Sequence, residues 1–153
     1  MIIRDATNRD LGSLAKLGYQ LSKYEAHCDT HLKIRISTIR QKKLEFTKKL
    51  KRKNVKILVV EFDGSLIGYC IGSIEKAPQY FDIKKIGYVN SCFVDDKFRG
   101  QSIGKQLISS LILWFKNKRI NVIELGVLHA NISATVWRKM GFQDYYIKMR
   151  KLI

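Results

Sequence analysis

A single proline, three cysteines and no long apolar run set the first limits on this chain of 153 residues. With one proline and ten glycines there is no low-complexity linker, which predicts one continuous domain over residues 1–153. The longest apolar stretch, Leu107–Phe115, is interrupted by two serines and is far shorter than the roughly 20 residues of a membrane-spanning helix. Three widely spaced cysteines do not form a disulfide framework, so we expect reduced thiols and a cytoplasmic protein without a membrane partner.

Acidic side chains are scarce as well. The chain has 13 Asp and Glu and 29 Lys and Arg residues, which gives a formal net charge of +16. Such a charge favours an anionic ligand, cofactor or partner and disfavours a strongly cationic one. Lysines crowd residues 42–53, which keeps a small basic nucleic-acid-binding module as one alternative. These lysines follow an amphipathic helical pattern, so we favour a solvated helix face and do not expect nucleic acid as a partner.

Apolar residues make up 46% of the chain, enough for one compact core, and this excludes a disordered protein. Apolar periodicity and turn residues predict an order of elements. The expected strands are 2–4, 55–62, 65–74, 86–94, 121–128 and Phe142–Met149, and the expected helices are 11–21, Ser37–Lys53, 103–118 and Ile132–Met140. The order β-α-α-β-β-β-α-β-α-β indicates a mixed α/β (α+β) class, with a mostly antiparallel central sheet flanked by helices.

Two glycines bracket a polar turn in the stretch FRGQSIGKQL, Phe98–Leu107, between a predicted strand and a predicted helix. A helix N-terminus has free N–H groups and the positive end of the helix dipole, and glycines let that backbone approach phosphate oxygens. A Walker A loop is excluded, because only three residues separate Gly100 from Gly104 and Lys105 is followed by Gln106. The Rossmann pattern G-x-G-x-x-G is absent too.

A third pattern fits the loop better. The stretch VDDKFRGQSIG, Val94–Gly104, resembles the coenzyme A loop of the GNAT superfamily, the acetyl-CoA-dependent N-acetyltransferases, which reads Q/R-x-x-G-x-G/A after a strand. Arg99 and Gly104 match its first and last positions, whereas Ser102 replaces the middle glycine. The opening strand and helix, the hairpin ILVVEFDGSLIGYCIGSI and the stretch ELGVLHANISATVWRKMGF also resemble the family, in order and over nearly the whole chain.

The resemblance implies the GNAT fold and acetyl-CoA as cosubstrate, with no metal. The strand ending at Val94 would splay from the strand at 122–128, and the pantetheine arm would lie in the gap. Backbone groups near the strand end would hold the thioester, and the loop would hold the pyrophosphate. The cofactor-binding residues implied in this way are Cys92, Phe93, Val94, Arg99, Gly100, Gln101, Ser102, Ile103, Gly104, Lys105 and Asn131.

The family's usual acid and base positions carry other residues here. The positions where members often have an acidic residue are Asn90 and Gly126, and the usual tyrosine falls at Trp137, whose indole is only a hydrogen-bond donor. We therefore expect a water molecule held by Asn90 or Tyr88 to take the amine proton. His27 and His31 have the i, i+4 spacing of a metal pair, but no second ligand cluster accompanies them, so we expect no metal.

Three functions stay open at this point. The resemblance favours an N-acetyltransferase that acts on a primary amine of a small molecule or of a protein N-terminus. A non-catalytic acyl-CoA-binding protein of the same fold and the basic nucleic-acid-binding module are the alternatives. The acceptor is not identified by the sequence, and a homodimer is left open.

Overall fold

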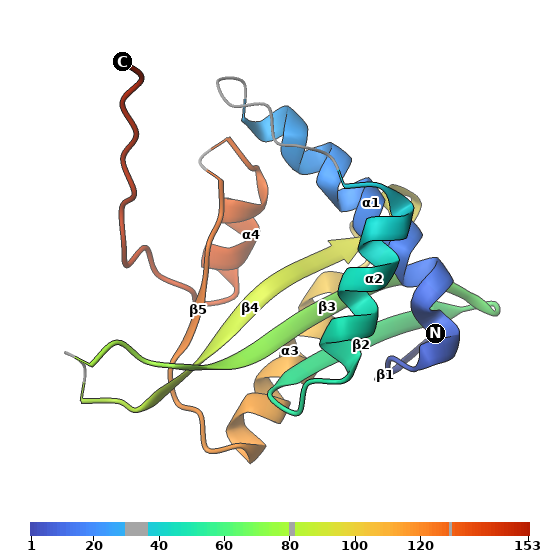
Figure 1. Ribbon diagram of the computed structural model, residues 1–153, viewed down its shortest axis with the longest axis horizontal. Helices are drawn as coiled ribbons and strands as arrows, with labels where there is room; N and C mark the ends of the chain where they lie inside the picture. The colour runs from blue at the N-terminus through green and yellow to red at the C-terminus, as the bar shows by residue number, and fades with distance from the viewer. Residues whose placement is uncertain (30–36, 80–81, 129) are drawn as a thin grey trace.

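The computed structural model describes residues 1–29, 37–79, 82–128 and 130–153. A five-stranded sheet forms its centre, with the strands side by side in the order β1-β2-β3-β4-β5 (Figure 1). The strands are β1 Ile2–Asp5, β2 Val55–Phe62, β3 Ser65–Lys76, β4 Lys85–Val94 and β5 Ile123–Leu125. The helices are α1 Leu11–Cys28, α2 Ile39–Leu50, α3 Ile103–Asn117 and α4 Ser133–Lys139, with short 3-10 turns at Asn8–Asp10 and Asp96–Phe98.

The sheet is mixed, as the sequence predicts. Strands β1 to β4 pair antiparallel with their neighbours, and β5 pairs parallel with β4 after the crossover through α3. Asp63 and Gly64 form the β2–β3 turn with φ of 48° and 70°, the left-handed conformations that a two-residue hairpin turn requires. The expected class, a mostly antiparallel sheet flanked by helices, is confirmed.

Helices cover the two faces of the sheet, with α1 and α2 on one face and α3 on the other (Figure 1). The α3 side is packed by Leu107, Leu111 and Phe115, which are fully buried. A Cβ atom at Gly72 would lie 2.7 Å from Leu111, and one at Gly87 would lie 2.7 Å from Phe115. These two glycines therefore let the C-terminal half of α3 lie close to β3 and β4.

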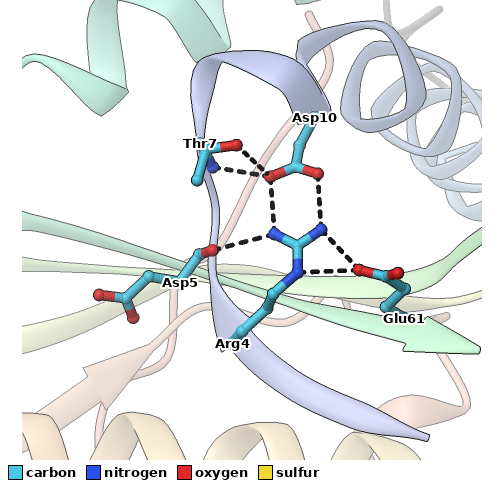
Figure 2. A network of polar contacts seen from close by, with 5 residues as sticks. All are labelled: Arg4, Asp5, Thr7, Asp10 and Glu61. Carbon is cyan, nitrogen blue, oxygen red and sulfur yellow. Dashed lines mark hydrogen bonds and ion pairs between the residues drawn. The ribbon is translucent and has the colours of Figure 1, made fainter. Parts of the chain in front are cut away.

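A polar network fixes the start of the chain to the sheet (Figure 2). Arg4 donates from both terminal nitrogens to the two carboxylate oxygens of Asp10, at 2.9 Å each, and from Nε to Glu61 at 2.9 Å. The backbone N–H and the hydroxyl of Thr7 also donate to Asp10, at 2.7 and 3.0 Å. The hydrogen bonds from Arg4 lower the pKa of the buried Asp10 carboxyl to about 2. The network joins β1, β2 and the beginning of α1.

The expected strand Phe142–Met149 is wrong, because residues 142–153 form no strand in the structure. Tyr145, Ile147 and Met149 alternate along the chain as a half-buried strand would, yet their side chains are 68%, 82% and 89% exposed. Alternating apolar residues suit a strand with one buried face, but a strand also needs hydrogen bonds to a neighbouring strand. The strand expected over 121–128 is shorter as well, because only Ile123–Leu125 pair with β4.

Among the helices of the described ranges, none combines the length and the hydropathy needed to span a bilayer.

Candidate functional site

Strands β4 and β5 part partway along their length. Their last paired residues are Val89 and Leu125, whereas β4 continues for five further residues to Val94. Asn90 lies at the point of parting and is an extra residue in β4, because Val89 pairs with Gly72 and Ser91 pairs with Ile71. This β-bulge bends the strand away from a regular ladder. The edge of β4 that faces away from β3 is therefore free of strand partners from 90 to 94, within the described residues.

Tyr88 and Asn90, the two residues expected to hold a catalytic water molecule, both lie at this parting. A Cβ atom on Gly126 would be 3.1 Å from the Tyr88 hydroxyl, so this hydroxyl lies against the backbone where β5 ends. Asn90 is exposed, as its place in the bulge allows. The Tyr88 side chain therefore reaches the end of β5, and Asn90 lies at the point where β4 and β5 part.

The three strand residues expected to bind the cofactor line the end of β4. Phe93 packs with α1 and α2, whereas Cys92 and Val94 pack toward α3. Burial raises the pKa of the Cys92 thiol to about 12. Cys92 is therefore a neutral packing residue at physiological pH.

The glycine loop leads from the end of β4 into α3. Asp95 accepts a hydrogen bond from the N–H of Lys97 and so closes the 3-10 turn that begins the loop. Gly100 has φ of 80° and Ser102 has φ of 59°, which are left-handed conformations. Ser102 is the N-cap of α3, but its hydroxyl forms no cap hydrogen bond. The N–H groups of the first helical turn, at Ile103, Gly104 and Lys105, therefore remain available to an anion.

Arg99 turns back toward β4 at the start of this loop. Its Nε donates to the backbone oxygen of Val94 at 3.0 Å, and its guanidinium pairs with Asp96 at 2.6 Å. The same guanidinium lies over the rings of Tyr24 and Phe93, 5.7 and 5.4 Å from their centroids. Lys105 and Gln101, by contrast, are exposed on the loop surface.

Asn131 lies on the opposite side of the parting, just before α4. Its Oδ1 accepts hydrogen bonds from the N–H of Ser133 at 2.9 Å and from the hydroxyl of Tyr24 at 3.3 Å. Two of the expected cofactor-binding residues, Arg99 and Asn131, thus contact one tyrosine of α1, and Arg99 also lies over Phe93. The sequence motifs do not place this tyrosine on the cofactor side. The available signal was helical spacing, because Tyr24 continues the apolar face of Leu17 and Leu21.

Trp137 is a packing residue. It belongs to the cluster on the α3 side of the sheet, and its ring meets that of Phe142 edge to face at 5.6 Å. The indole therefore fixes α4 to the core.

Two cavities lie outside the parting of β4 and β5. One of about 570 Å³ lies at the far end of the β3–β4 hairpin, between Ile74, Pro78 and Lys85. A smaller one of about 320 Å³ lies beside the glycine loop, lined by Phe62, Phe98 and Gln101.

Within the part of the chain that the structure describes, no group of three His, Cys, Asp or Glu side chains is placed to hold an ion. His31, the second member of the histidine pair, lies outside the described residues.

Similar proteins share this architecture. An uncharacterized N-acetyltransferase of Methanocaldococcus jannaschii is 28% identical over 102 residues, which are 62% of this chain and 42% of that protein. The chain spans about half the length of the curated relatives it matches. A mutant of the BH1408 protein of Bacillus halodurans has a TM-score of 0.82 at 21% identity, over 100% of this chain and 99% of that chain. The aminoglycoside N-acetyltransferase AAC(6')-Iy, in complex with CoA, has a TM-score of 0.79 at 23% identity, over 98% and 93%.

These structural likenesses show a shared fold. The model of the acetyltransferase (GNAT) family matches residues 21–142, a range that includes both parted strands, the glycine loop and Asn131. Since this match covers most of the sequence, the chain belongs to the GNAT acetyltransferase family.

Proposed function

We propose that this protein transfers the acetyl group of acetyl-CoA to a primary amine of a small molecule or of a protein N-terminus. The observation that carries the proposal is the parting of β4 and β5 at Asn90, next to the loop that presents free N–H groups at the start of α3. The parted strands suit the extended, amide-containing pantetheine arm of acetyl-CoA, and the N–H groups of the loop suit its pyrophosphate. The CoA bound to the structurally similar aminoglycoside acetyltransferase supports the same cosubstrate.

The free edge of β4 would bind the pantetheine arm as an added strand. Backbone groups of Cys92, Phe93 and Val94 would pair with its amides, and one N–H would donate to the thioester oxygen. The same N–H would stabilise the oxyanion of the tetrahedral intermediate, an interaction worth about 2.7–4 kcal/mol in other acyl-transfer enzymes. The N–H groups from Gly100 to Lys105 would bind the pyrophosphate, and the exposed Lys105 would add charge.

The reaction joins the amine nitrogen to the thioester carbon, and the carbon–sulfur bond then breaks. The amine loses one proton to a water molecule held between Asn90 and Tyr88, from which the proton reaches solvent. The sulfur departs as a thiolate, which is a tolerable leaving group because the pKa of an ordinary thiol is near 8.5. Trp137 supplies no proton, because an indole N–H is not acidic and this partly buried ring packs against the core.

A non-catalytic acyl-CoA-binding protein is the second candidate. It is favoured by Asn90 itself, since an exposed amide stands where a carboxylate would take the amine proton. An acyl-CoA sensor of this fold would bind the cosubstrate as tightly as an enzyme but would release no thiol.

Cytoplasmic placement and self-association complete the proposal. The three free cysteines at 28, 70 and 92 support a reducing compartment. The exposed apolar side chains of Tyr145, Ile147 and Met149 support a second copy as partner. Light scattering on the full chain tests this point, and a mass of one chain at micromolar concentration would count against it.

The testing experiment pairs a calorimetric titration of acetyl-CoA with an amine screen that detects free CoA thiol. Saturable binding together with amine-dependent thiol release supports the transferase. Binding without release for any amine class favours the sensor. An absence of binding would reject both candidates.

A further inference from the structure

Tyr24, a residue of α1, connects the end of β4 to the segment that follows β5. It lies in the C-terminal half of α1, and its hydroxyl donates to Oδ1 of Asn131, which is 107 residues further along the chain. Its ring is covered by the guanidinium of Arg99, which in turn donates to the backbone of Val94 at the end of β4. Tyr24 therefore contacts the end of β4 through Arg99 and the segment after β5 through Asn131.

The hydrogen bonds of Asn131 determine which way its amide faces. Oδ1 accepts from two donors, the N–H of Ser133 and the hydroxyl of Tyr24. An amide oxygen has two lone pairs, so both acceptor sites of Oδ1 are filled. The NH₂ group forms no hydrogen bond to another described residue and therefore points away from these two donors. It has two N–H bonds to give to a carbonyl oxygen.

The Tyr24 phenol remains a donor at physiological pH. Burial raises the pKa of Tyr24 above its ordinary value, and the nearby Cys28 adds to the increase. The hydroxyl is therefore protonated whenever the protein is folded near neutral pH, and the orientation of the Asn131 amide does not depend on a titration in that range.

We infer that Tyr24 is a positioning residue for the cosubstrate: its hydroxyl fixes the Asn131 amide so that the NH₂ group donates to a carbonyl of the pantetheine arm. This inference rests on the proposed function and adds to it a residue from α1. The pantetheine arm carries two amide carbonyls, and in the proposed function it would lie along the parted strands, where Asn131 would hold it. Tyr24 acts through Asn131 and takes no part in the acetyl transfer itself.

The test is a double-mutant cycle on acetyl-CoA affinity, measured by calorimetry. Tyr24→Phe keeps the ring under Arg99 and removes only the donor, and it should weaken binding about three- to tenfold. Asn131→Asp keeps the acceptor oxygens for Ser133 and Tyr24 but lacks the NH₂ group, so it should weaken binding at least as much. The double variant should bind no more weakly than Asn131→Asp alone, because Tyr24 acts only through the lost group.

Two controls separate positioning from general damage. Tyr19→Phe, on the same helix and without contact to Asn131, should leave the affinity unchanged. Adenosine 3′,5′-bisphosphate, which has no pantetheine arm, should bind the parent protein and all variants equally. Additive effects in the cycle, unchanged affinity in Tyr24→Phe or an equal loss for the armless nucleotide would each overturn the inference while leaving the proposed function intact. If the parent protein failed to bind acetyl-CoA, the proposed function would fail first.

Discussion

Gly104 offers a direct test of the anion loop, because the fold tolerates a side chain there and the proposed ligand does not. It is the second residue of α3 and has ordinary helical φ. A Cβ atom at this position would meet only a methyl group of Val94 at 3.9 Å, an ordinary contact. Replacing a helical glycine and placing an acid near a helix N-terminus are each favourable. We therefore expect Gly104→Asp to leave the free energy of unfolding unchanged or to raise it by up to about 1 kcal/mol.

The effect on binding should be opposite and large. A carboxylate at this position would lie among the N–H groups proposed to bind the pyrophosphate. At an effective dielectric constant of about 20, a single pair of like unit charges about 4–6 Å apart costs roughly 3–4 kcal/mol. The affinity for acetyl-CoA should therefore fall by about 100- to 1,000-fold. A variant that simply failed to fold would lose both stability and affinity. Here the affinity should fall while the stability is kept or raised.

Gly104→Asn is the matched control, since it has nearly the same shape without the charge. Calorimetric titration of acetyl-CoA and thermal unfolding should be measured for the parent protein and both variants, at low and at moderate salt. The aspartate variant should bind much more weakly than the asparagine variant, and the difference should shrink as salt rises. Unchanged affinity in Gly104→Asp would refute the loop assignment, and equal losses in both variants would refute the electrostatic argument.

Three further predictions concern other parts of the molecule. Ser102→Gly removes the backbone strain of a serine in the left-handed conformation, so it should raise the free energy of unfolding by about 0.5–1 kcal/mol. It should weaken acetyl-CoA binding no more than a few-fold, and a large loss of affinity in calorimetry would show that the hydroxyl is an essential contact. Arg4 lowers the folded-state pKa of Asp10 to about 2 from 3.8, so Asp10 contributes stability above pH 3.8 that is lost as pH falls toward 2. Asp10→Asn should therefore lower the free energy of unfolding in urea by about 2 kcal/mol at pH 7 and by much less at pH 2. Glu61→Gln, at a half-exposed site, should lower it by less than about 1 kcal/mol. Asn90→Ala should lower kcat/KM by an amount that corresponds to about 0.5–1.5 kcal/mol of transition-state stabilisation. In both proteins kcat/KM should rise with pH as the amine acceptor deprotonates. A titration of kcat/KM near pH 6 to 7 that does not depend on the pKa of the acceptor would reveal a base on the enzyme.

Features with a local cause were predictable from the sequence. The turn at Asp63-Gly64 and the start of α3 after Gly100 follow from backbone preferences of the residues that form them. The mixed sheet followed from a strand, a crossover helix and a second strand in succession. For these elements the chain needs no information from distant segments.

Features that depend on a partner were not predictable in the same way. The bulge at Asn90 exists because Ile71 and Gly72 pair on either side of it, and nothing in the letters of β4 marks an extra residue. The alternation of Tyr145, Ile147 and Met149 predicted a strand that has no neighbour to accept it. The hydrogen bond from Tyr24 to Asn131 joins residues that only the fold brings together.

Because α3 packs closely against Gly72 and Gly87, a change at these glycines can alter the position of the whole helix. The contacts lie at Leu111 and Phe115, and the first turn of α3 at the glycine loop is about 10–16 Å away at 1.5 Å per residue. A methyl group added at Gly87 would push Phe115 and with it the C-terminal half of α3 away from the sheet. The resulting tilt of the helix would displace the N–H groups of its first turn. Gly87→Ala should therefore lower acetyl-CoA affinity in the same titration although every residue of the loop is intact. Unchanged affinity in a folded Gly87→Ala variant would show that the helix yields locally and transmits nothing.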